Sequence, residues 1–176
     1  MTRRLLAAVF AGALGAAPAP LLAQTSISVA GGVNAPVGRL GDIADLGYNI
    51  SGGLNFGGTS LPVGLRLEGA YNSLGLKGSG DVRIITGTGN AIFNVGQTKD
   101  APYLIAGLGV YNRNFSSNTF GYGTGKTVLG INGGGGLRFP LSGISTFFEA
   151  RYHVMLGNSG DGTSYQFIPI TFGIMF

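Results

Sequence analysis

The sequence predicts an all-β protein, built as one eight-stranded antiparallel up-and-down β-barrel. Large apolar residues alternate with small or polar ones in segment after segment, which is the period of a strand and not of a helix. Glycine contributes 34 of the 176 residues and is spread too widely for long helices. The connections between these segments are alternately short and long, as expected for an up-and-down barrel whose two ends differ.

The composition also separates the chain from ordinary soluble domains. Only 10% of its residues are charged and its mean hydropathy is +0.32, whereas soluble domains carry about 25% charged residues. The absence of cysteine excludes a disulfide framework and any cysteine-based metal site. The length suits a single domain.

The first residues, "MTRRLLAAVFAGALGAAPAPLLAQ", follow the pattern of a secretory signal peptide. Arg3 and Arg4 precede an apolar run, Leu5–Leu14, and small residues follow. Pro18 and Pro20 would interrupt a membrane-anchoring helix, the alternative interpretation. We therefore expect residues 1–23 to be a cleaved signal peptide and residues 24–176 to form the barrel. Cleavage leaves only a small positive net charge, which excludes a strongly basic nucleic-acid surface.

The eight expected strands are bounded by turn-forming residues. No stretch after the signal segment reaches the roughly 18 uninterrupted apolar residues that a membrane-spanning helix needs. The first four strands are expected at Thr25–Asn34, Tyr48–Gly57, Val63–Asn72 and Val82–Val95, and the last four at Tyr103–Arg113, Val128–Phe139, Ser145–Leu156 and Tyr165–Phe176.

The two faces of these strands differ in charge, which decides their orientation. The apolar face carries no charge except Arg83, beside a long connection. A soluble lipocalin-type barrel would turn this face inward, but its exterior would then be short of charge. The alternative is a transmembrane barrel, apolar outside, whose narrow lumen is filled by side chains. The expected charge network of the lumen is Arg66, Glu68, Arg113, Arg138, Glu149, Arg151 and His153.

Aromatic residues of the apolar face fall into two groups, as the girdles of a membrane barrel do. The phenylalanines are expected near the rim of the short turns and the tyrosines near the opposite rim. The residues are Phe56, Phe93, Phe139 and Phe176, and Tyr48, Tyr71 and Tyr152.

The chain ends with "FIPITFGIMF", in which apolar residues alternate up to a final phenylalanine. Together with the signal peptide, "PYLIAGLGVYN" and "STFFEARYHVMLG", this segment resembles the small bacterial outer-membrane β-barrel family, of the OmpA-barrel and OmpX-like type. The resemblance covers nearly all of residues 24–176. It implies location in the outer membrane among lipid and lipopolysaccharide, and termini in the periplasm. It also implies recognition of the last strand by the barrel-assembly machinery, for which Phe172, Ile174 and Phe176 would be the signal.

Three motifs resemble sites of known chemistry. "FGYGTGKT" at Phe120–Thr127 imitates a phosphate-binding loop, but it lacks the first glycine and a strand follows it. "NGGGG" at Asn132–Gly136 is better explained by strand curvature. Glu149, Arg151 and His153 share one strand face but lack a nucleophile: the lipid A deacylase barrels pair a histidine with a serine two residues later, where Met155 stands here. We therefore expect no catalytic residue and no cofactor.

The scattered acids of the long connections could gather a divalent cation, although such acids are usually only solvated. They are Asp42, Asp45, Asp81 and Asp161.

The expected function is a non-enzymatic structural or surface-interaction role, with the lumen plugged by the charge network and the long loops exposed. Two alternatives stay open. One is a lipid-modifying outer-membrane enzyme. The other is a narrow solute or ion channel, because glycines on the inner face could leave space. Those glycines are Gly53, Gly64, Gly107, Gly109, Gly130, Gly134 and Gly136.

Overall fold

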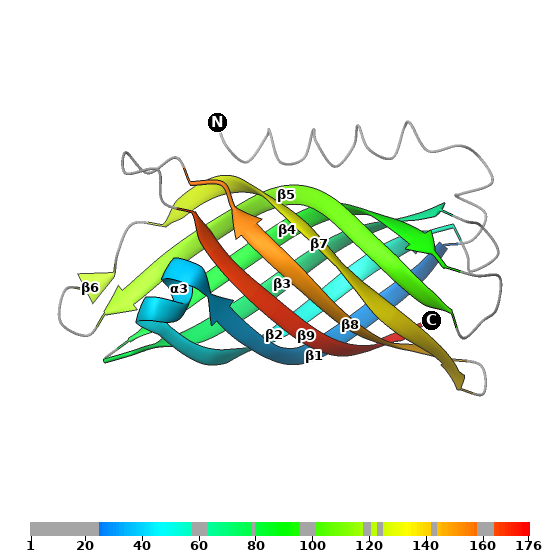
Figure 1. The fold of residues 1–176 in the computed structure, drawn as a ribbon, viewed down its shortest axis with the longest axis horizontal. Helices are drawn as coiled ribbons and strands as arrows, with labels where there is room; N and C mark the ends of the chain where they lie inside the picture. The colour runs from blue at the N-terminus through cyan, green and yellow to red at the C-terminus, as the bar shows by residue number, and fades with distance from the viewer. Residues whose placement is uncertain are drawn as a thin grey trace.

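The computed structural model of the chain is a closed antiparallel barrel of eight long strands (Figure 1). It describes residues 25–57, 63–78, 80–95, 101–117, 121–122, 125–141, 144–157 and 164–176. The segment expected to be a signal peptide lies outside these residues. The elements are β1 (Thr25–Val37), α3 (Gly38–Ile43), β2 (Ala44–Phe56), β3 (Val63–Leu76), β4 (Asp81–Asn94), β5 (Pro102–Ser117), β6 (Gly121–Tyr122), β7 (Lys126–Leu141), β8 (Ile144–Met155) and β9 (Tyr165–Met175).

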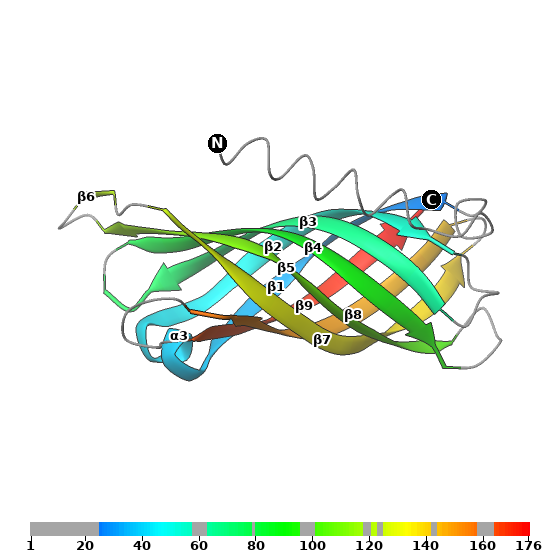
Figure 2. The same ribbon diagram turned by 90° about the horizontal axis from the view of Figure 1, so that it is seen from above.

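The strands follow one another around the barrel in the order β4-β3-β2-β1-β9-β8-β7-β5, and pairing of β4 with β5 closes the ring. The two-residue strand β6 adds to the far end of β5. The first and last strands are neighbours, and Ile27 and Phe176 exchange two backbone hydrogen bonds of 3.1 and 2.9 Å. The view from above shows both chain ends of the barrel at one end, here called the terminal end (Figure 2). The opposite end carries α3 and β6 and is called the α3 end.

The expected orientation of the strand faces is confirmed by side-chain burial. On β2, Ile50 is 57% exposed, whereas its neighbours Asn49 and Ser51 are 3% and 6% exposed. The same alternation runs through the other long strands, so the apolar face points out and the polar face points into the lumen. Arg83 lies on the outer face, as expected, and its Nε donates to Asp81 at 2.6 Å. Within the described ranges, no helix is long and apolar enough to span a membrane.

The strand ends at the α3 end correct the expected boundaries. β1 continues to Val37, β3 to Leu76 and β5 to Ser117, so the connections are shorter than expected. Backbone pairing continues past the apolar belt because a ladder of hydrogen bonds does not need apolar side chains. The helix α3 lies within the connection expected to be a loop, and Gly38 with φ 54° begins it. Asp45 and Asp81 consequently lie on strands and not in loops.

The aromatic residues of the outer face agree with the expected girdles at all but one described position. Phe93, Phe139 and Phe176 are about half exposed near the terminal end, and Tyr48 and Tyr152 are exposed toward the α3 end. The rings of Tyr48 and Tyr71 lie 6.3 Å apart. Phe56 is the exception, since only 8% of it is exposed. The chain turns directly after it, at Gly57 with φ 84°, so this ring is covered, unlike the other phenylalanines of its group.

Candidate functional site

The interior of the barrel brings four charged side chains together from opposite walls. Arg66 and Glu68 point inward from β3, and Glu149 and Arg151 point inward from β8. These two strands are four places apart in the ring of eight, so they face each other across the lumen. In both strands the charges are two residues apart, the spacing that places side chains on one face of a strand. We call these four residues the ion-pair cluster.

Every member of the ion-pair cluster meets two opposite charges. Arg66 Nη1 lies 2.9 Å from Glu149 Oε2 and 3.7 Å from Glu68 Oε2. Arg151 Nε lies 2.9 Å from Glu149 Oε1, and Arg151 Nη2 donates to Glu68 Oε1. All four side chains are 5% exposed or less. Two cations and two anions in alternation make the cluster neutral, which is the arrangement that a buried set of charges needs.

Neutral side chains complete the hydrogen bonding of this cluster. The Tyr103 hydroxyl donates to Glu149 Oε2 at 2.6 Å, and Arg66 Nε donates to Asn55 Oδ1 at 2.8 Å. The Arg66 guanidinium also lies over the Phe147 ring, 5.0 Å from its centre. These contacts fix the plane of the guanidinium and one carboxylate oxygen. The arrangement is therefore ordered by side chains from β2, β5 and β8 as well as β3.

The other three residues of the expected charge network lie elsewhere in the lumen. Arg138 lies nearer the terminal end, where its Nη1 donates to Asn94 Oδ1 at 2.8 Å and its guanidinium lies over the Tyr103 ring. Arg113 lies at the α3 end between two aromatic rings, 4.8 Å from Phe115 and 4.2 Å from Tyr165. The sequence therefore predicted one charge network, whereas the structure spreads its residues over the length of the barrel.

His153 is surrounded by aromatic side chains. Its ring stacks on Phe167 at 4.8 Å, and Nδ1 lies 2.9 Å from the Tyr111 hydroxyl. Glu149, which the catalytic alternative would use to orient it, is bound instead to Arg66, Arg151 and Tyr103. The described contacts of His153 are those of a packed core side chain.

The α3 half of the lumen contains an apolar cluster that the sequence interpretation missed. Leu40 of α3 is fully buried and points down into the barrel mouth. The sequence analysis expected the inner face to carry small and polar residues. However, the alternation of inward and outward positions along the strands already places Val82, Ile84 and Phe167 inside. That alternation, followed to the strand ends, could have revealed the cluster. The apolar cluster is Leu40, Ala44, Leu74, Val82, Ile84, Tyr111, Met155 and Phe167.

The inner glycines do not leave open space. A Cβ on Gly136 would lie 2.5 Å from the Tyr103 ring, and one on Gly130 would lie 2.6 Å from the Tyr111 ring. These two glycines let the large inward rings approach the wall closely. The other five inner glycines are also closely approached, since a Cβ at each would lie 3.2 Å or less from another heavy atom. The space that motivated a channel is occupied by neighbouring atoms.

Other expected sites are placed as follows. In the described part of the chain, no three histidine, cysteine or acidic residues gather as a metal site. Asp42 lies on α3, and Asp161 lies outside the described residues. Strand β7, and not a helix, follows the loop that imitates a phosphate-binding motif. Phe172 and Phe176 of the expected assembly signal point outward and are 56% and 63% exposed.

Comparison with solved structures identifies the fold. Neisserial surface protein A (NspA) superposes with a TM-score of 0.66 and 14% identity, over 86% of this chain and 95% of that one. The chain has the fold of the small outer-membrane β-barrels. The N-terminal β-barrel domain of Pseudomonas aeruginosa OprF matches with a TM-score of 0.52 and 16% identity, over 87% of this chain and 100% of that one.

A third small outer-membrane barrel agrees with this fold. Ail, the attachment invasion locus protein of Yersinia pestis, solved with the heparin analogue sucrose octasulfate, matches with a TM-score of 0.51 and 18% identity. The match covers 86% of this chain and 97% of that one. No protein-family model matches the chain, and no curated protein sequence does.

Proposed function

We propose that this protein is an integral outer-membrane barrel with a non-enzymatic structural or surface-interaction role and a lumen closed by side chains. The observation that carries the proposal is the inverted distribution of polarity: buried ions inside and half-exposed apolar side chains outside. In water this exterior would be one continuous apolar surface, far larger than soluble proteins tolerate. Lipid removes that cost, and a closed barrel satisfies its own backbone hydrogen bonds.

Closure of the lumen is supported at two levels. The ion-pair cluster joins opposite walls through Arg66 and Arg151. Nearer the α3 end, Leu40, Tyr111 and Phe167 belong to one buried apolar cluster. An ion passing through would have to break several charge-assisted hydrogen bonds and then cross an apolar layer, both of which are costly.

The outer surface and the α3 end are the parts left to interact. The half-exposed aromatic rings suit the interfaces of an outer membrane, with lipid and lipopolysaccharide as surroundings. Phe172, Ile174 and Phe176 on the lipid-facing side of β9 suit recognition by the barrel-assembly machinery. Like Neisserial surface protein A, as that name states, the protein would act at the cell surface, through its α3 end.

Refolding with and without lipid tests the proposal. The mature chain, residues 24–176, should give a faster-running unboiled band and β-type circular dichroism in detergent or vesicles, and should aggregate without them. A monodisperse, soluble β-protein in plain buffer would contradict the membrane barrel and would favour an inward-facing, lipocalin-like carrier.

One observation favours the narrow channel as a second candidate. Buried side-chain atoms of Asn132, Arg151 and Asn49 have no protein hydrogen-bond partner among the described residues. Such atoms are usually satisfied by water, and linked waters would make a narrow path. With Arg138 and Arg113 added to a neutral ion-pair cluster, that path would prefer anions. Cation-selective conductance, or none, would reject this version.

The lipid-modifying enzyme is tested separately. Unchanged lipid A in cells overproducing the protein would reject it.

A further inference from the structure

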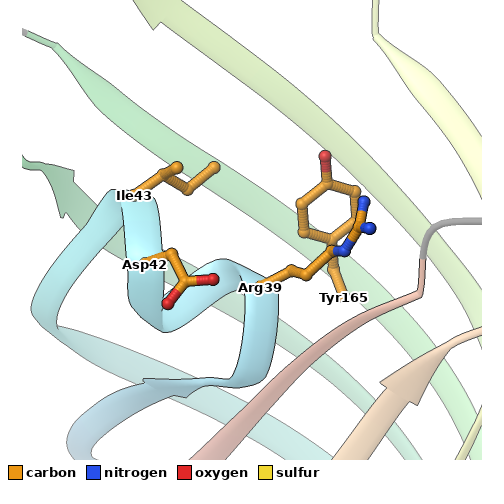
Figure 3. Close-up of a pocket in the computed structure, with 4 residues that line it drawn as sticks. All are labelled: Arg39, Asp42, Ile43 and Tyr165. Atoms are coloured by element: carbon orange, nitrogen blue, oxygen red, sulfur yellow. The ribbon is translucent and has the colours of Figure 1, made fainter.

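The α3 end has a pocket lined by residues of α3 and β9 (Figure 3). Its volume is about 420 Å³, and it is lined by Arg39, Asp42, Ile43 and Tyr165. This volume falls within the range of roughly 300–1,000 Å³ that small-ligand pockets occupy. Figure 3 shows the Arg39 guanidinium beside the Tyr165 ring, with Asp42 and Ile43 on the neighbouring turn of α3. A cation, an anion, an aromatic ring and an apolar side chain thus share one cavity.

The walls of this pocket are held in place by one buried side chain and by hydrogen bonds to α3. Leu40, which follows Arg39 directly in α3, is fully buried in the apolar cluster. Lys77 fixes the other side of α3, because its Nζ donates to the Gly41 carbonyl at 2.7 Å and its backbone N–H donates to the Ile43 carbonyl at 2.9 Å. A pocket whose walls are fixed before binding loses less entropy when a ligand enters.

Tyr165 is also held rigidly. The Arg113 guanidinium lies 4.2 Å from the centre of its ring, and the centre of the Phe115 ring lies 6.3 Å from that of Tyr165. Arg113 brings a second positive charge close to the pocket. The described residues of the α3 end include more cations than acids: Arg39, Lys77, Arg83, Arg113 and Lys126 against Asp42, Asp45 and Asp81. The pocket therefore lies in a positive field, which attracts anions.

The chemistry of the four lining residues selects among anionic ligands. A bare phosphate would gain from Arg39 but would be repelled by Asp42. A ligand that carries both an acid group and hydroxyl groups uses both, because the guanidinium donates to the acid and the carboxylate accepts from a hydroxyl. One face of the Tyr165 ring is covered by the Arg113 guanidinium, so the ring edge is the part that can contact the C–H side of a sugar ring.

We infer that this pocket binds an acidic sugar, meaning a saccharide unit that carries a carboxylate or phosphate. Arg39 receives the acid group, Asp42 accepts from the hydroxyls, and Tyr165 supports the ring. The inference rests on the proposed surface-interaction function and names its ligand class. Such a sugar occurs in the lipopolysaccharide of the surrounding membrane and in polysaccharides outside the cell.

Calorimetric titration of the refolded mature chain in lipid nanodiscs tests this inference. The probes are oligogalacturonate and the matching neutral galactose oligomer, which differ in their carboxylates. We expect saturable binding of the acidic oligomer and at least about tenfold weaker binding of the neutral one. Equal binding of the two, or none, overturns the inference.

Variants then place the site. Arg39→Ala should weaken binding of the acidic oligomer by about tenfold, whereas Arg83→Ala, which removes the same charge outside the pocket, should change it less than about twofold. Asp42→Ala should also weaken it, because the carboxylate that accepts from the hydroxyls is lost. Equal effects of the two arginine variants, or tighter binding by Asp42→Ala, would show a general positive surface and would overturn the acidic-sugar assignment.

Nanodiscs with and without lipopolysaccharide separate the two sources. If lipopolysaccharide competes with the soluble oligomer, the pocket takes sugars of its own membrane; if it does not, the pocket takes foreign saccharides. Each preparation is first checked for the faster-running unboiled band. A correctly folded barrel that binds no acidic sugar would refute the pocket assignment and leave the proposed membrane-barrel function standing. A chain that lacks the band would refute both.

Discussion

The middle and terminal half of the lumen is built around Arg66, Glu149 and their partners, whereas the α3 half is built around Leu40, Tyr111 and Phe167. Both halves are buried, but they respond differently to change. Buried ions stabilise only while every partner is present, and one deletion leaves an uncompensated charge. An apolar cluster loses stability in proportion to the volume removed. The comparison predicts one fragile and one tolerant layer within the same barrel.

Removal of one charge from the ion-pair cluster should have the largest effect. Glu149→Gln leaves Arg66 and Arg151 facing a neutral amide, so the free energy of unfolding should fall by about 3–5 kcal/mol. Urea titration of the barrel in lipid vesicles, followed by the heat-modifiable band, measures it. Asp81→Asn, at the exposed pair with Arg83, should cost at most about 1 kcal/mol. Similar losses for the two variants would contradict a fragile layer.

Truncation of a side chain in the apolar cluster should lower stability less than removal of a charge from the ion-pair cluster. Leu40→Ala should lower the free energy of unfolding by about 2–3 kcal/mol, near the lower end for buried leucines because α3 lies at the mouth and can shift. The same titration applies. Leu46, which is 72% exposed, provides the matched control, and Leu46→Ala should change stability by about 0.5 kcal/mol or less. A Leu40→Ala loss above that of Glu149→Gln would reverse the comparison.

Glycine substitutions test whether inward rings press on the wall. Gly136→Ala would place a methyl group 2.5 Å from Tyr103, and the resulting overpacking should cost about 1–3 kcal/mol. On the outer face, a Cβ at Gly87 would come no closer than 3.6 Å, to Val110. Gly87→Ala should therefore be neutral or slightly stabilising. If Gly136→Ala proved equally harmless, the Tyr103 ring could move away from the wall and would not be pressed against it.

The smallest effect is expected where a hydrogen bond lies inside the apolar half. Tyr111→Phe removes the hydroxyl that lies 2.9 Å from His153 Nδ1 and should cost about 1 kcal/mol. Tyr152→Phe on the exposed outer face is the control and should be close to neutral. A loss of several kcal/mol for Tyr111→Phe would show that polar contacts, and not apolar packing, hold this half together.

The fold could be predicted because a strand has a period of two and lipid accepts only one face. The sequence alone therefore indicates that Ile50 points outward and that Asn49 points into the lumen. The pairing of Arg66 with Glu149 could not be predicted, because it depends on which strands face each other across the ring and on the register between them.

The helix α3 and its buried Leu40 were missed for a different reason. A six-residue helix is too short to show a 3.6-residue period, and it forms because Leu40 finds an apolar cavity that only the closed barrel provides. Arg113 was placed in the charge network because it points inward, but parity says nothing about depth along the barrel. Its aromatic partners, Phe115 and Tyr165, lie on different strands at the α3 end.

Single-barrel conductance in planar bilayers shows whether two chemically different layers close the lumen. Wild type, Glu149→Gln, Leu40→Ala and the double variant are compared after each shows the faster-running unboiled band. Wild type and both single variants should show no conductance, because at least one layer stays intact in each, whereas the double variant should show step-like openings. Steady step-like conductance by the wild-type barrel would contradict this closure and would make the narrow channel the function.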